Sequence, residues 1–138
     1  MAAGIYNFII EQGTTVDFRI DYKDSDGNPF DLTEYTARMQ IRDAPKGSIL
    51  YAYLTSTLTP CGTGLDLSPE VDGVQQPLTS GSIGISISAL SSSAFTFDQA
   101  YYDLEIVSGS GNCEVVNRIL QGKVKLSKEV TYWCLREL

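Results

Sequence analysis

The chain has 138 residues, a length at which one domain buries roughly two-thirds of the surface of its unfolded chain, so we expect a single core. Seventeen acidic and ten basic residues give a net charge of −7, which repels phosphate backbones and anionic membrane surfaces. We therefore expect neither nucleic acid nor a membrane as a partner. No apolar stretch approaches the ~20 residues that cross a bilayer, and no signal peptide pattern opens the chain, so we expect synthesis in a cytoplasm.

Alternation of apolar and polar residues predicts strands in the first half of the chain. Residues 16–21 alternate cleanly and run into a turn-forming cluster at 24–29. Residues 30–32 could form a short strand, and a clear strand follows at 35–42. After a break that contains Pro and Gly, the alternation resumes at 49–54, which predicts a hairpin-like connection.

The second half opens on a long segment, 55–81, that is rich in Thr, Ser, Gly and Pro and predicts a loop or irregular edge with one possible short strand at 65–67. Residues 82–87 alternate again, and one helical turn is expected within 88–95. Two further alternating runs, 100–106 and 119–126, flank a Ser-Gly-rich turn and predict a hairpin. This register places Phe18, Met39, Leu104 and Val124 inward, and Arg38, Asp103 and Lys123 outward or toward a partner. In the last run Ile119 alternates with Leu120, on the same side as Lys123.

These elements predict an all-β fold, an antiparallel immunoglobulin-like β-sandwich of about seven or eight strands with at most one short helix. A β-barrel is the alternative. No linker, charge block or fixed repeat divides the chain, so residues 1–131 are expected to form one sandwich domain.

The residue types exclude most catalytic chemistry. Histidine is absent, which removes Ser-His-Asp and Cys-His nucleophilic systems and the commonest metal ligand. No Cys-x-x-Cys spacing and no phosphate-binding Gly-rich loop occurs. We therefore expect a non-enzymatic protein with no cofactor and no metal. The three cysteines, Cys61, Cys113 and Cys134, fit buried or incidental thiols better than a disulfide framework, although one bridge within or between chains is the alternative.

Three groups of residues could still form a site, but an ordinary structural role explains each better. Paired carboxylates could hydrolyse glycosides, yet solvated strand faces account for them. Oxygen ligands in one turn could hold calcium, yet a hairpin turn needs the same residue types. Aromatic residues could stack on a sugar, yet sheet packing uses them as well. The three groups are Asp66, Glu70, Asp103 and Glu105; Asp24, Asp26, Asn28 and Asp31; and Tyr51, Tyr53, Tyr101, Tyr102 and Trp133.

Four segments carry a family resemblance: 6–15, 31–42, 101–106 and 122–131. In their strand and turn patterns they resemble small β-sandwich virion proteins of tailed phages, whose members look like tail or baseplate components. The resemblance implies a non-enzymatic structural component of a virion (tail, baseplate or neck) that assembles in the host cytoplasm. Its partners would be other virion structural proteins in a symmetric, multi-copy assembly. A carbohydrate- or host-receptor-binding module of the virion is the alternative, with a glycan as its ligand.

The segment 132–138 is unusually apolar for a chain end and is expected to be a docking element. It could cover its own sandwich or a neighbouring subunit. The residues expected to bind a partner are Tyr132, Trp133, Leu135 and Leu138.

Deletion of residues 132–138 tests this expectation. If the segment docks on a neighbour, the truncated chain should keep its melting temperature but enter particles in far fewer copies, since large aromatic anchors dominate interface energy. Calorimetry and protein copies per purified particle measure the two effects. A much lower melting temperature would instead place the segment in the chain's own core, and normal incorporation would exclude a role in assembly.

Overall fold

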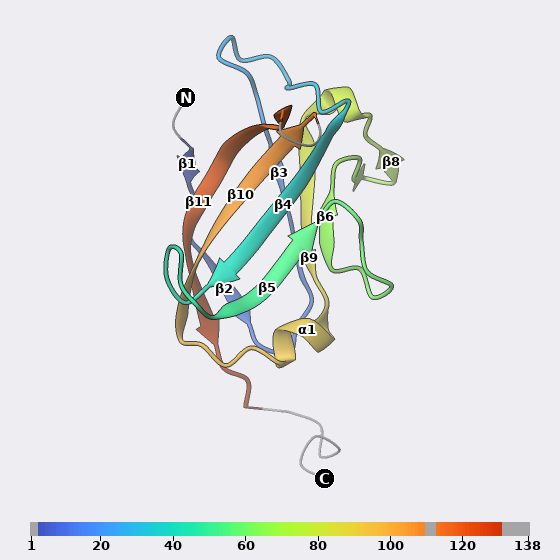
Figure 1. Cartoon of the computed structure of the whole chain (residues 1–138). Coiled ribbons are helices and arrows are strands. Elements are labelled where there is room, and N and C mark those ends of the chain that lie inside the picture. The colour runs from blue at the N-terminus through green and yellow to red at the C-terminus, as the bar shows by residue number, and fades with distance from the viewer. Residues whose placement is uncertain (1–2, 110–112, 131–138) are drawn as a thin grey trace.

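Two β-sheets pack face to face and enclose the apolar positions of their strands, so the all-β sandwich class predicted from the sequence is confirmed (Figure 1). The computed structural model describes residues 3–109 and 113–130. The elements in chain order are β1 (Gly4–Ile5), β2 (Phe8–Glu11), β3 (Val16–Asp21), β4 (Tyr35–Arg42), β5 (Leu50–Thr55), β6 (Gly64–Asp66), β7 (Glu70–Val71), β8 (Val74–Gln75), the 3-10 helix η1 (Leu78–Ser80), β9 (Ser82–Ile87), the helix α1 (Ala89–Ser93), β10 (Gln99–Ser108) and β11 (Val115–Ser127).

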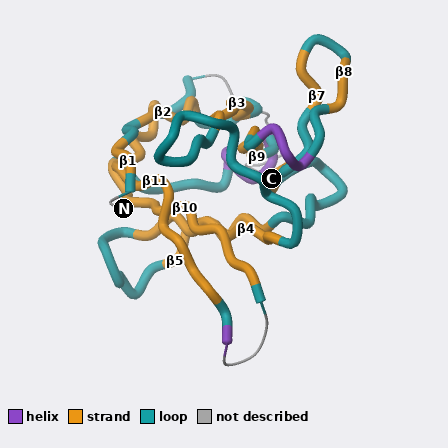
Figure 2. The backbone as a smooth tube through the Cα atoms, turned by 90° about the horizontal axis from the view of Figure 1, so that it is seen from above, coloured by secondary structure: helices purple, strands orange, loops and turns teal. Residues whose placement is uncertain are grey.

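The larger sheet has six strands in the order β1-β11-β10-β4-β5, with β2 also paired to β11. Strand β10 is central and pairs antiparallel with both β11 and β4, so the predicted hairpin of β10 and β11 is confirmed. The second sheet has the order β3-β9-β6, and Figure 2 shows β3 and β9 in a layer opposite β4, β5, β10 and β11.

The core lies between these two sheets. The larger sheet contributes Met39, Leu104 and Val124, which are 0–1% exposed, as their inward assignment predicts. The smaller sheet contributes the isoleucines of β9, and Phe18 of β3 packs against this core while staying partly exposed. Burial of this apolar surface is the main term that stabilises the sandwich.

One inward–outward assignment is wrong because of a β-bulge. Leu104 lies opposite Leu120, but the next residue of β10, Glu105, lies opposite Arg118, so β11 carries an extra residue at Ile119. The bulge turns the Ile119 side chain into the core, where it is 6% exposed, instead of onto the outer face. Strand β11 therefore changes its alternation at this point.

The segment 55–81 contains more structure than the expected loop with one short strand. Strand β6 confirms that short strand within one residue, but β7, β8 and η1 were not expected. The β7–β8 hairpin turns at Asp72-Gly73, and both residues have positive φ (53° and 82°), as a two-residue hairpin loop with a type I′ turn requires. The possible strand at 30–32 does not form; Leu32 is buried, and its N–H donates to the Leu78 carbonyl at 2.9 Å.

The expected helical turn is α1, which begins at an N-cap serine. The Ser88 hydroxyl accepts a hydrogen bond from the Ser91 N–H, which satisfies one free donor of the first turn. The fully buried Ser92 hydroxyl donates to the Thr14 carbonyl at 2.7 Å. The helix is thereby fastened to the connection between β2 and β3.

The N-terminal segment runs parallel to β11 and covers part of its edge. Strands β1 and β2 pair with Leu120–Gln121 and Val124–Ser127, and between them the Asn7 side chain replaces the backbone by accepting a hydrogen bond from the Lys123 N–H at 2.8 Å. The Tyr102 hydroxyl donates to the Tyr6 carbonyl at 2.6 Å. These parallel pairings were not predicted from the alternation, and they fix the position of residues 3–7 beside the sheet.

Replacement of Gly122 by alanine should loosen this junction. A Cβ atom at position 122 would overlap the Tyr6 carbonyl and Asn7, so Gly122→Ala should lower the free energy of unfolding by about 1–3 kcal/mol and speed amide exchange at Tyr6. Chemical denaturation and hydrogen exchange measure these effects. The matched control is Gly4→Ala, whose Cβ would lie at an ordinary 3.6 Å from Leu120, and it should change stability by no more than ~0.5 kcal/mol. Equal effects of the two substitutions would contradict this packing.

Candidate functional site

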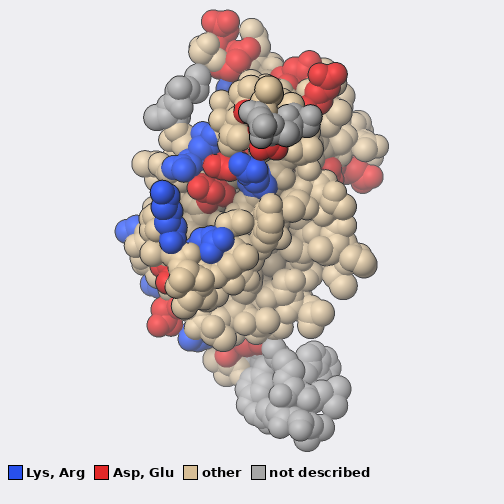
Figure 3. Space-filling model, in the orientation of Figure 1, with Lys and Arg blue, Asp and Glu red and all other residues tan. Residues whose placement is uncertain are grey.

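A groove of about 730 Å³ crosses the outer face of the six-stranded sheet over β4, β10 and β11. We call it the basic groove. One wall is Ile5 and Asn7 of the N-terminal segment, and the opposite wall is the loop Ala44–Lys46 that follows β4. Figure 3 shows Lys and Arg side chains gathered over this face, around a few acidic ones.

Strand register brings the residues of the floor together. Tyr101 of β10 lies opposite Arg42 of β4 on one side and Lys123 of β11 on the other, so an aromatic ring is flanked by two cations. The Lys123 ammonium lies 5.9 Å from the centroid of the Tyr101 ring, within the range of a cation–π contact. The next outward row carries Gln40, Asp103 and Gln121 in the same manner.

The loop wall is held to the floor by Arg42. Its Nη1 donates to the Gly47 carbonyl at 3.0 Å, and its Nε donates to the Gln40 side chain at 2.9 Å. Within the loop, the Gly47 N–H donates to the Ala44 carbonyl at 2.7 Å. These bonds present the exposed Lys46 side chain at the rim of the groove.

The groove is positively charged although the whole chain is acidic. Four cations and one carboxylate line it, which gives a net charge of +3 against −7 for the chain. Arg118 pairs with Asp103 at 3.4 Å. In the described part of the chain, Arg42, Lys46 and Lys123 form no ion pair with any carboxylate. Three cations therefore remain available to an anionic partner.

The acidic residues of this face are held by arginines. Glu105 accepts a hydrogen bond from Arg38 Nε at 2.8 Å, and this contact raises the pKa of Arg38. Burial raises the pKa of Asp103 above its ordinary value and nearby Glu105 raises it further, against the opposing effects of Arg118 and Arg38. Arg38 and Asp103 lie on the outer face, as the sequence predicts, but both are partly buried there.

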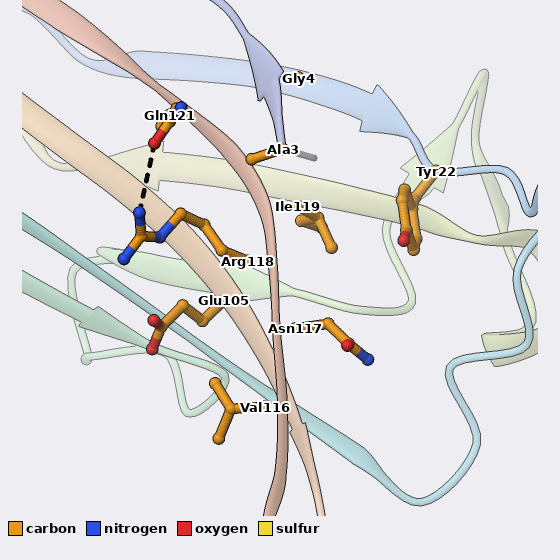
Figure 4. A pocket seen from close by; sticks show the side chains of 9 residues that line it. All are labelled: Ala3, Gly4, Tyr22, Glu105, Val116, Asn117, Arg118, Ile119 and Gln121. Atoms are coloured by element: carbon orange, nitrogen blue, oxygen red, sulfur yellow. Dashed lines mark hydrogen bonds between the residues drawn. The ribbon is translucent and has the colours of Figure 1, made fainter. Parts of the chain in front are cut away.

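A second hollow, of about 760 Å³, follows the free edge of β11. Figure 4 shows Val116, Arg118 and Glu105 on one side of this strand and Tyr22 and Ile119 on the other. Residues 115–118 of β11 are exposed and extend past the pairing with β1. Such an edge presents backbone donors and acceptors to which another strand can pair.

The structure does not assemble the other sites considered from the sequence. The Tyr51 ring packs against Phe97 in a tilted arrangement, with the ring centroids 4.7 Å apart, and Tyr102 is buried, so neither ring is available to a sugar platform. Tyr53 and Tyr101 point outward. Of the four carboxylates, Asp103 and Glu105 share one face of β10, and the Asp66 carboxylate accepts a hydrogen bond from the Ser68 N–H. Glu70 lies on β7, away from that face.

The carboxylate oxygens of Asp24 and Asp31 accept hydrogen bonds from backbone N–H groups close by in the chain. The Asp24 carboxylate accepts hydrogen bonds from the Asp26 and Asn28 N–H groups at 2.9 and 3.0 Å, and Asp31 accepts one from Thr33 at 2.9 Å. These bonds are those of a self-capped turn. Among residues 3–109 and 113–130, no cluster of His, Cys, Asp or Glu has the arrangement of a metal site.

Two expectations concern cysteines and the chain end. Cys61 and Cys113 are exposed free thiols, which fits the expectation of incidental thiols and not that of buried ones. Cys134 and the residues expected to bind a partner lie outside the described residues; these are Tyr132, Trp133, Leu135 and Leu138.

No protein-family model matches the chain, and no curated protein is significantly similar to it. No helix in the described ranges is long and apolar enough to span a membrane. The basic groove is therefore chosen as the candidate site from its position, lining residues and charge. Alternation places two floor residues, Asp103 and Lys123, on an outward face, but it does not predict that the floor residues come together, because it does not reveal which strands are neighbours.

Because the pKa of Asp103 is raised, replacement of this residue should increase the stability of the fold by an amount that depends on pH. Folding favours the protonated carboxyl, so the ionised form costs stability as pH rises through the folded pKa, and the cost is absent below the unfolded pKa. Asp103→Asn should therefore be more stable than the wild type at pH 7, because the lost ion pair with the half-exposed Arg118 contributes little.

Denaturant unfolding at several pH values measures this difference, which should vanish below about pH 3, where the wild-type carboxyl is protonated. The control Asp98→Asn alters a carboxylate that is 95% exposed and should be neutral throughout. A less stable Asp103→Asn variant at neutral pH would show that the Arg118 ion pair outweighs the cost of burial.

Proposed function

We propose that this chain is a non-enzymatic structural component of a tailed-phage virion, in its tail, baseplate or neck, and that it holds neighbouring subunits through its sheet surfaces. The observation that carries the proposal is the basic groove, in which three cations have no ion-pair partner in the described chain; Arg42 and Lys123 lie on the sheet, and Lys46 lies on the loop beside it. Charges on an exposed surface contribute little to the stability of the fold, whereas they attract and orient a partner of opposite charge.

The rigidity of the floor supports a structural role. On β4 and β10 the outward residues of the groove alternate with buried ones: Gln40 with Met39 and Ile41, and Asp103 with Leu104. Because protein cores are close-packed, the inward side chains hold the backbone of these strands in place. The outward side chains therefore keep fixed distances from one another. A subunit that sets the distance and orientation of its neighbours needs this property.

The free edge of β11 is a second surface suited to assembly. An exposed strand with Val115 and Val116 outside the sheet pairing of β1 can accept a strand from a neighbour, in which case main-chain hydrogen bonds supply affinity. The similarity of four sequence segments to small β-sandwich virion proteins gives the kind of particle in which such a subunit would act.

Particles from the phage that encodes the chain test this proposal. Quantitative mass spectrometry of gradient-purified particles should find the chain in multiple copies per particle, and deletion of its gene should stop assembly at a defined intermediate visible by electron microscopy. Wild-type chain supplied in trans should restore assembly. Lys46→Glu/Lys123→Glu in the groove should fail to restore it, whereas the control Lys125→Glu/Lys128→Glu, with the same change of net charge outside the groove, should succeed.

The proposal would be contradicted if particles lacked the chain, or if deletion left both particle structure and infectivity unchanged. Assembly that is normal without the chain, together with selective binding to a glycan panel, would instead favour the receptor-binding alternative.

A further inference from the structure

We propose that the basic groove receives the acidic β3–β4 connection of a second copy of this chain, so that copies join head to tail. We call residues 22–34 the acidic connection. The inference rests on the proposed structural function and names the partner of its groove.

The two surfaces match in charge. The acidic connection carries Asp24, Asp26, Asp31 and Glu34 against Lys23, a net charge of −3, and the groove carries +3. Three of the four acidic residues, Asp26, Asp31 and Glu34, are exposed, and Asp24 is half-buried. In the described part of the chain none of the four forms an ion pair, just as three of the groove cations form none. Each surface therefore carries charged groups that have no ion-pair partner in the described part of their own subunit, and the other surface carries groups of the opposite charge.

The acidic connection is ordered before it binds. The Asp24 N–H donates to the Asn28 carbonyl at 2.9 Å and the Gly27 N–H donates to the Asp24 carbonyl at 3.0 Å, while the Asp24 carboxylate fixes the other amides of the turn. Figure 1 shows this connection projecting beyond the sandwich at the end where β4 begins. A preformed turn loses little conformational entropy on docking.

The contact must join two molecules. The acidic connection leads into Tyr35 at the start of β4, whereas the groove lies at Arg42 at its end, and a strand of this length separates them by roughly 24 Å. The turn of one copy therefore does not reach the Arg42 end of its own groove, where Arg42, Lys46 and Lys123 lie, although Tyr22 of the connection lines the neighbouring hollow together with Arg118. Because the two contacting surfaces differ, the interface is heterologous, and such interfaces produce closed rings or open filaments.

Sedimentation velocity of the purified full chain tests the inference. The wild type should self-associate at low ionic strength and dissociate as salt is raised, because exposed charges are screened beyond about 8 Å at physiological ionic strength. Lys46→Glu/Lys123→Glu should weaken self-association at least about tenfold, as should Asp26→Lys/Glu34→Lys in the acidic connection. The control Lys125→Glu/Lys128→Glu should associate like the wild type.

A mixture of the two interface variants gives the decisive result. The variant with an acidic groove keeps its acidic connection, and the variant with a basic connection keeps its basic groove. Neither should associate alone, but together they should co-assemble in a 1:1 ratio, because the acidic connection of the first meets the basic groove of the second and the basic connection of the second meets the acidic groove of the first. Circular dichroism melts of both variants verify that they are folded.

The inference is overturned if the wild type stays monomeric at low salt and high concentration, if both variants associate like the wild type, or if their mixture does not co-assemble. Its failure is distinct from that of the proposed function. A chain that is required in particles but monomeric in solution removes the head-to-tail contact alone, whereas a chain that associates as described but is absent from particles removes the virion function alone.

Discussion

The register of β10 between β11 and β4 is the constraint on which the rest of the structure depends. One face of this ten-residue strand supplies Ala100, Tyr102, Leu104 and Ile106 to the core, and the other face supplies the central residues of the basic groove. A shift of one residue would exchange the two faces, burying Asp103 and exposing Leu104. The free energy that buries the core therefore also fixes the position of the groove. Site and fold are specified by the same pairing.

Alternation predicted the strands that are buried on one face. The expected segments 35–42 and 82–87 match β4 and β9 at both ends, and the inward positions on β4 and β10 are correct. These strands satisfy the simplest physical rule of a half-buried sheet, that successive side chains point to opposite faces. Where the alternation is uninterrupted, a single sequence is sufficient to predict the strand and its buried face.

The elements that were not predicted depend either on contacts with distant strands or on the residue types of a turn. The bulge at Ile119 is invisible in a run where Ile119 and Leu120 are both apolar, because only the partner strand decides which one turns inward. The parallel pairing of β1 and β2 depends on a strand more than a hundred residues away. By contrast, Asp72-Gly73 is a strong local hairpin signal, and the β7–β8 hairpin could have been predicted from it.

The groove shows how net charge conceals local charge. Arg42, Tyr101 and Lys123 are far apart in the chain and become neighbours only through the ladders of β10. The composition of an acidic chain indicates repulsion from anions, and this holds at a distance, where the fields of all charges are summed. Within a groove lined by +3, the nearest charges dominate.

The docking of the N-terminal segment on β11 also has a consequence for the order of folding. Phe8 pairs with Val124, and Asn7 bonds to Lys123, a separation of 116 residues, so this pairing closes nearly the whole chain into a loop. Long-range closures of this kind slow folding, because the entropy of the loop is lost before the contact stabilises the chain. During synthesis the first strands have no partner until the last strand has left the ribosome. The wall formed by Ile5 and Asn7 consequently cannot form before β11 is available, and a nascent chain that lacks β11 does not present the finished groove to a neighbour.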